Sequence, residues 1–123
     1  MTKEDTEPMD TPHRIPVRLR FTAEHYEKLA NGFNPEEMAD KWFIYFENNV
    51  IHFYRSWTGY ETYYAELIPE NDGSYVITEI FAERNAKKYT NTDDERDAVL
   101  FPKVLGYLVL YVNPDDLQDK RKE

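Results

Sequence analysis

Apolar and polar positions along residues 41–57 form two aromatic runs on either side of Asn48 and Asn49. Aromatic and β-branched side chains favour strands. Two consecutive Asn residues can supply the positive φ values of a two-residue hairpin turn. The pattern therefore predicts an antiparallel β-hairpin that turns at Asn48-Asn49.

The turn position also predicts the register and the two faces of this hairpin. Three cross-strand pairs are expected: Phe46 with Ile51, Ile44 with Phe53, and Trp42 with Arg55. The more apolar face, expected to meet the helices, carries Trp42, Ile44, Phe46, Ile51 and Phe53. The opposite face carries Phe43, Tyr45, His52 and Tyr54. We expect this second face to be uncovered, so that it offers a surface for homodimerisation.

The residues before the hairpin predict a strand and a helix. Residues 15–21 alternate apolar and basic side chains, and Pro16 makes them an edge strand. Thr22 is placed to cap a helix that ends at Asn31-Gly32. A second, short helix is expected to begin at Asn34.

The residues after the hairpin predict two more strands and a closing helix. The strands cover residues 60–68 and 74–83. Thr92 or Asp93 caps the helix, because acidic residues crowd its first turn. Pro102 lies inside that helix and should kink it. Residues 107–112 can be read as helix or strand, and the apolar spacing favours helix.

These elements together predict an α+β fold. The expected sheet is an antiparallel meander of about four to five strands, ordered roughly as in the chain, with N-terminal and C-terminal helices on one face. Residues 15–112 form the single domain. Residues 1–14 are expected to be a disordered tail, and residues 113–123 a charged tail.

Composition narrows the classes of function. The 123 residues include no Cys, which excludes disulfides and thiolate chemistry, and the formal net charge is −9. An acidic chain is not suited to binding the nucleic-acid backbone. The sequence shows no apolar run long enough to cross a membrane and no signal peptide, so we expect a cytoplasmic protein. It also shows no metal-ligand spacing and no phosphate-binding Gly loop, so we expect no cofactor.

The candidate site begins where the hairpin ends. Arg55, Ser56, Trp57, Thr58, Gly59 and Tyr60 combine a cation, hydroxyls, aromatic rings and a Gly that lets the backbone bend. A guanidinium can hold a phosphate or carboxylate, and Trp can stack on a planar group. We expect Arg84 to join Arg55 in binding the anion, with Tyr89, Asp93 and Asp94 beside them. The competing interpretation pairs the two Arg residues with the acidic helix start.

The motifs that carry this site resemble those of a family of small, uncharacterised bacterial domains. The resemblance covers residues 38–110 and rests on W-F-I-Y-F-E, then F-x-R-S-W-T-G, then Arg84-Asn85, Tyr89 and Thr92-Asp93-Asp94. It implies a domain that occurs alone or beside enzymes acting on ADP-ribose and related nucleotides. It implies no activity, and Pro102 departs from the uninterrupted helix that the resemblance leads us to expect.

Three functions remain open from the sequence. The first is a non-catalytic module that binds an anionic, nucleotide-like small molecule or a partner. The second is a hydrolase or transferase acting on a nucleotide or ADP-ribose-like substrate, with Glu47 or Asp94 as acid or base. The third is an acidic interaction or inhibitory protein that docks on a basic partner.

Overall fold

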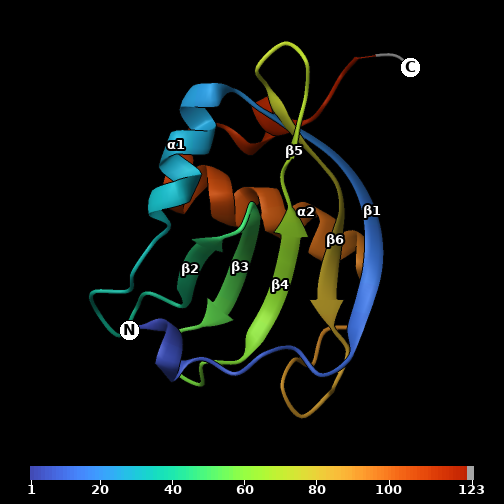
Figure 1. Ribbon diagram of the computed structural model, residues 1–123. Helices are drawn as coiled ribbons and strands as arrows, with labels where there is room; N and C mark the ends of the chain where they lie inside the picture. Colours follow the sequence, from blue (N-terminus) through green and yellow to red (C-terminus); the bar gives the residue numbers. More distant parts are fainter. Residues whose placement is uncertain (122–123) are drawn as a thin grey trace.

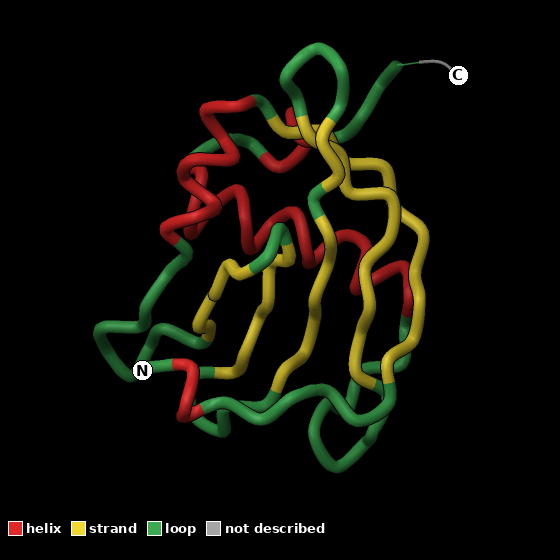
Figure 2. The backbone as a smooth tube through the Cα atoms, in the orientation of Figure 1, coloured by secondary structure: helices red, strands yellow, loops and turns green. Residues whose placement is uncertain are grey.

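The computed structural model describes residues 1–121 as an antiparallel sheet with its helices on one side (Figures 1 and 2). The α+β class predicted from the sequence is confirmed. The strands are β1 (Pro12–Phe21), β2 (Trp42–Glu47), β3 (Val50–Arg55), β4 (Glu61–Glu66), β5 (Ile68–Pro69) and β6 (Tyr75–Glu83). The helices are α1 (Ala23–Asn31) and α2 (Asp94–Val104), which continues as a π-helical segment (Leu105–Leu110), with short 3-10 turns at Lys3–Asp5 and Pro114–Leu117.

The sheet combines a meander with one long-range pairing. Its order is β1-β6-β4-β3-β2, and β5 extends the pairing of β6. The meander from β2 to β6 follows the chain as expected, whereas β1 lies beyond β6 at the far edge. The edge position predicted for this strand is correct, and its register shifts between Pro16 and Leu19. A shift fits this position because Pro16 has no N–H to give to the ladder.

The β2–β3 hairpin has the predicted turn and register. Asn48 and Asn49 have φ values of 55° and 62°, as a type I′ turn requires. All three expected cross-strand pairs are present, including Trp42 opposite Arg55. The register of the hairpin therefore fixes the position of Arg55, the last residue of β3, opposite Trp42.

Both helices pack on the apolar face of the sheet, where they bury the core. Leu29 of α1 and Phe101 of α2 are fully buried in it. The ring of Phe101 stacks on Phe53 of β3, with centroids 4.5 Å apart. Figure 1 shows α2 crossing behind the strands, and neither α1 nor α2 lies over the other face of the sheet.

The closing helix begins as predicted and changes its hydrogen bonding after Pro102. The carboxylate of Asp93 accepts from the N–H groups of Glu95 and Arg96 and caps α2. Pro102 cannot donate to the preceding turn, and the chain continues as a π-helix from Leu105. Tyr111, with φ of 56°, ends that segment. Residues 107–110 are thus helical, and the strand alternative is wrong.

The predicted domain ends need correction. Strand β1 starts at Pro12, and the residues before it run along one end of the sheet (Figure 2) instead of forming a free tail. Buried carboxylates hold them: Glu83 accepts from the N–H groups of Asp10 and Thr11 at 2.8 and 2.9 Å. At the other end, Leu117 is fully buried in the core. The part of the predicted C-terminal tail at residues 122–123 lies outside the described residues.

The short helix expected after Asn34 is a turn. The carboxylate of Asp40 accepts from the N–H groups of Glu36 and Glu37, at 2.9 and 3.3 Å. These bonds satisfy the two N–H groups locally, so no helix is needed to do so. This turn positions the segment that leads into β2 and forms one wall of the site.

Candidate functional site

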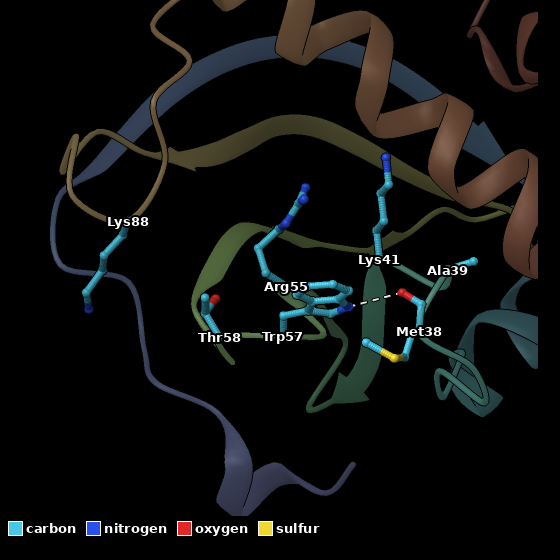
Figure 3. A pocket seen from close by; sticks show the side chains of 7 residues that line it. All are labelled: Met38, Ala39, Lys41, Arg55, Trp57, Thr58 and Lys88. Atoms are coloured by element: carbon cyan, nitrogen blue, oxygen red, sulfur yellow. Dashed lines mark hydrogen bonds between the residues drawn. The ribbon is translucent and has the colours of Figure 1, made fainter.

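A hollow of about 350 Å³ opens where the β3–β4 turn meets the segment before β2 (Figure 3). Its lining comes from three parts of the chain: Met38, Ala39 and Lys41; Arg55, Trp57 and Thr58; and Lys88. The structure thus brings together three of the predicted site residues, Arg55, Trp57 and Thr58. We call this hollow the Arg55 pocket.

The turn that carries the pocket is fixed by Gly59 and Ser56. Gly59 has a φ of 76°, and a Cβ at this position would lie 2.1 Å from the carbonyl oxygen of Asp5. Only Gly fits such a close approach. Ser56 donates its hydroxyl to the carbonyl of Asp40 at 2.6 Å, and its N–H bonds to Lys41. The Ser56 hydroxyl therefore ties the turn to the opposite wall and does not face a ligand.

Trp57 forms an exposed aromatic wall of the pocket. Its side chain is held by one hydrogen bond, from Nε1 to the carbonyl oxygen of Met38 at 3.1 Å (Figure 3). The residue remains 72% exposed. A large ring that is oriented by its polar atom and still open to solvent is suited to stacking on a planar ligand.

Arg55 is oriented by an aromatic ring and has no acidic partner within the described residues. Its guanidinium carbon lies 4.7 Å from the ring centroid of Trp42. Trp42 is buried and stacks on Tyr63, with centroids 6.0 Å apart. Within residues 1–121, neither Arg55 nor Lys41 forms an ion pair. The pocket therefore presents two unneutralised cations.

Lys88 differs from these two cations because carboxylates already neutralise it. Its Nζ lies 3.0 Å from Glu7 and 3.2 Å from Asp10. The hydrogen bond with Glu7, followed by that with Asp10, raises the pKa of Lys88 despite partial desolvation. Tyr60, a predicted site residue, does not line the pocket and has the Nζ of Lys88 over its ring, 5.1 Å from the centroid.

The other predicted site residues form a separate structural cluster. The guanidinium of Arg84 donates to Asp94 at 2.8 Å and to Asp97 at 2.7 Å. Burial opposes the charge, but these two carboxylates raise the pKa of Arg84. Asp93 caps α2 and does not orient either Arg. The prediction that Arg84 shares an anion with Arg55 is wrong, because Arg84 already has its anions.

Asp97 organises this second cluster, which we call the Asp97 cluster. Its carboxylate is fully buried and accepts from Tyr63, from Tyr89 at 2.7 Å, and from Asn91 at 2.9 Å, in addition to Arg84. Burial and then the bond to Asp97 raise the pKa of Tyr63 and of Tyr89. Because Tyr63 also stacks on Trp42, the cluster supports the ring on which the Arg55 guanidinium rests.

Neither carboxylate named for acid–base chemistry lines the pocket. Glu47 pairs with Lys3 at 3.3 Å. Asp94 bonds to His13 and then Arg84, and these two bonds lower its pKa. Asp40, next to the pocket, accepts from two backbone N–H groups. Over the described part of the chain, no group of His, Asp and Glu is placed to hold a metal ion.

The face proposed for dimerisation is partly covered by the chain itself. Phe43 and Tyr54 are buried, and only Tyr45 and His52 remain half-buried. The N-terminal segment contributes to this cover: the Nζ of Lys3 lies 5.0 Å over the Tyr45 ring, and Phe43 and Tyr45 line a hollow together with residues 1–4. The four-ring uncovered patch expected from the sequence is therefore absent from this face.

Met38, Lys41 and Lys88 were not predicted as site residues. They lie 14 to 33 positions from Arg55 and belong to loops, and no pattern distinguishes them from other surface residues. Lys41 directly follows the acidic Asp40, so the charge pattern does not mark it in advance either.

Comparison of the chain with protein-family models, curated proteins and solved structures found no match. The resemblance to small bacterial domains therefore stays a prediction. Among the described residues, no helix is long and apolar enough to cross a bilayer.

Proposed function

We propose that this protein is a non-catalytic module that binds a small organic anion with a planar group in the Arg55 pocket. One observation carries the proposal: a guanidinium that has no acidic partner within residues 1–121 stands beside an oriented, exposed indole in a concave site. An unpaired Arg on a protein surface is common. Arg55, however, is held over the buried Trp42 ring and stands beside the exposed Trp57, so the pocket offers both a cation for an anionic group and a ring for a planar group.

The two groups supply interactions of useful size. A hydrogen bond to a charged group contributes about 1.5–3 kcal/mol. Stacking of a base on an aromatic ring contributes about 1–3 kcal/mol. Arg55 is already oriented by Trp42, and Trp57 by Met38, so less side-chain entropy is lost on binding. Together these terms amount to about 2.5–6 kcal/mol, so even before the cost of association is subtracted they support only weak binding, with a dissociation constant of roughly millimolar order.

The chemistry of the lining favours binding over catalysis. Its ionisable groups are Lys41, Arg55 and Lys88, and the seven lining residues include no carboxylate or imidazole. An acid–base mechanism on a nucleotide-like substrate needs such a group within hydrogen-bond reach. A nucleotide or ADP-ribose-like compound therefore fits better as a bound ligand than as a substrate, with its phosphate at Arg55 and its base on Trp57.

Isothermal titration with inorganic phosphate, AMP and ADP-ribose tests the proposal. Binding should require both an anion and a planar group, and should fall at least tenfold in Arg55→Ala and in Trp57→Ala. The matched controls are Arg96→Ala and Tyr111→Ala, which remove an exposed cation and an exposed ring outside the pocket. Equal binding by the pocket variants and these controls would show that the ligand binds elsewhere.

A further inference from the structure

A second hollow adjoins the Arg55 pocket. It also measures about 350 Å³, and Ala39 and Lys41 line both. Its remaining lining comes from the start of β2 and from one side of α2 and the π-helical segment: Asp40, Trp42, Leu100, Lys103, Val104, Tyr107 and Leu108. Figure 3 shows Lys41 extending from the pocket side toward a helix, so its aliphatic stem stands at the boundary. We call this second hollow the Tyr107 groove.

The lining of the Tyr107 groove is more apolar than that of the Arg55 pocket. Leu100, Val104 and Leu108 form its base, and Tyr107 is 62% exposed at its rim. Among residues 1–121, six large apolar residues are exposed, and three of them line these two hollows: Met38, Trp57 and Tyr107. Contiguous exposed apolar surface of this kind marks a binding site.

The charged side chains that line the two hollows are cationic except for Asp40, although the chain as a whole is acidic. The net charge is −9. Nevertheless Lys41, Arg55 and Lys103, all lining residues, lack an ion pair within the described residues. The one acidic lining residue, Asp40, accepts from the N–H groups of Glu36 and Glu37. An anion with an apolar arm complements both features.

We infer that the ligand of the Arg55 pocket is an amphipathic organic anion. Its anionic group binds Arg55 and Lys41, its ring stacks on Trp57, and its apolar arm passes the stem of Lys41 into the Tyr107 groove. This inference rests on the proposed function and specifies the class of compound: an aryl phosphate or carboxylate that carries an aliphatic chain. Each methylene buried in the groove should tighten binding by about fourfold until the groove is filled.

A chain-length series tests the inference. Phenyl phosphate, 4-ethylphenyl phosphate and 4-butylphenyl phosphate are titrated below their aggregation concentrations, with the change in Trp fluorescence as readout. In the wild type, affinity should rise steadily along the series. In Tyr107→Ser and Leu108→Asn, phenyl phosphate should bind with the wild-type affinity, but the ethyl and butyl substituents should no longer increase that affinity. Val99→Asn, an exposed apolar position of α2 outside both hollows, is the control and should keep the gain.

The outcomes separate this inference from the proposed function. If phenyl phosphate binding requires Arg55 but the affinity does not rise with the length of the ligand's aliphatic chain, the inference about the Tyr107 groove is wrong and the proposed binding at the Arg55 pocket stands. A chain-length gain that persists in both groove variants overturns it as well. If phenyl phosphate binds no more weakly to Arg55→Ala than to the wild type, or does not bind at all, the proposed function itself is wrong.

Discussion

Arg55 and Arg84 are alike in sequence and opposite in environment. Arg55 is the last residue of β3, and Arg84 directly follows β6. Arg84 is enclosed by two carboxylates of α2, whereas Arg55 rests on a Trp ring and has no acidic partner in the described chain. A buried, paired guanidinium stabilises the fold, and an unpaired one at a hollow is free to bind an anion. The difference between the structural role of Arg84 and the proposed binding role of Arg55 comes from the nearby carboxylates of Asp94 and Asp97, because the residue type is the same.

The largest effect should come from breaking the Asp97 cluster. Asp97→Ala removes the acceptor of bonds from Tyr63, Tyr89, Asn91 and Arg84, and leaves part of the Arg84 charge uncompensated. Loss of one partner of a buried ion pair costs about 3–5 kcal/mol. Urea denaturation should show a fall of that size in the free energy of unfolding, against almost none for the exposed Asp116→Ala. A fall below about 1 kcal/mol would mean that the cluster is not structural.

A smaller effect is expected in the turn that carries Arg55. Gly59→Ala must strain a positive φ and displace the carbonyl of Asp5, which a Cβ would approach to 2.1 Å. Gly73 has φ of 87° but open space around its Cβ position, so Gly73→Ala carries only the backbone cost of about 1–2 kcal/mol. Gly59→Ala should be clearly more destabilising than Gly73→Ala in thermal unfolding. Equal melting temperatures for the two variants would show that the N-terminal segment does not press on this turn.

The stability contributed by the buried carboxylate of Glu83 should depend on pH in the acid range. Burial alone would raise the pKa of Glu83, but hydrogen bonds from backbone N–H groups, including those of Asp10, Asn85 and Thr11, lower it. Its stabilising contribution is therefore complete above the unfolded carboxyl value of about 4.3 and is lost as pH falls through the lower folded value. Glu83→Gln should reduce the acid dependence of unfolding below pH of about 4.3. An unchanged pH profile would contradict this role for Glu83.

The smallest effects should distinguish the cations around the pocket. Lys41 forms no ion pair with any described residue, whereas Lys88 is already neutralised by Glu7 and Asp10. Lys41→Ala should therefore weaken phenyl phosphate binding several-fold, and Lys88→Ala by less, as measured by titration at low salt. The reverse order would show that Lys88 leaves its carboxylates to meet the ligand.

Local chemistry explains why some of this structure was predictable. The Asn48-Asn49 turn, the Thr22 and Asp93 caps and the two hairpin faces depend on residues a few positions apart. The pairing of β1 with β6, and the hold of Glu83 on residues 10 and 11, join segments about 70 positions apart. Such contacts have no short-range pattern, so the N-terminal segment was expected to be free.

The candidate site divides in the same way. Arg55, Trp57 and Thr58 were found because they are adjacent in one turn. Arg84 was wrongly joined to them, because the sequence does not show that Asp97 faces inward and meets it. Lys41 and Met38 were missed, because they reach the pocket only through the Asp40 turn and the bond from Trp57.

The Trp57 indole N–H gives the most direct test of anion binding at Arg55. Its resonance in a ¹H–¹⁵N spectrum can be told from that of the buried Trp42 by comparison with Trp57→Phe. On titration with phenyl phosphate, the Trp57 signal should move progressively in the wild type and stay still in Arg55→Ala. The backbone signals of Arg84 and Asp97 should not move in either protein. Movement that persists without Arg55, or that centres on Arg84, would contradict the account.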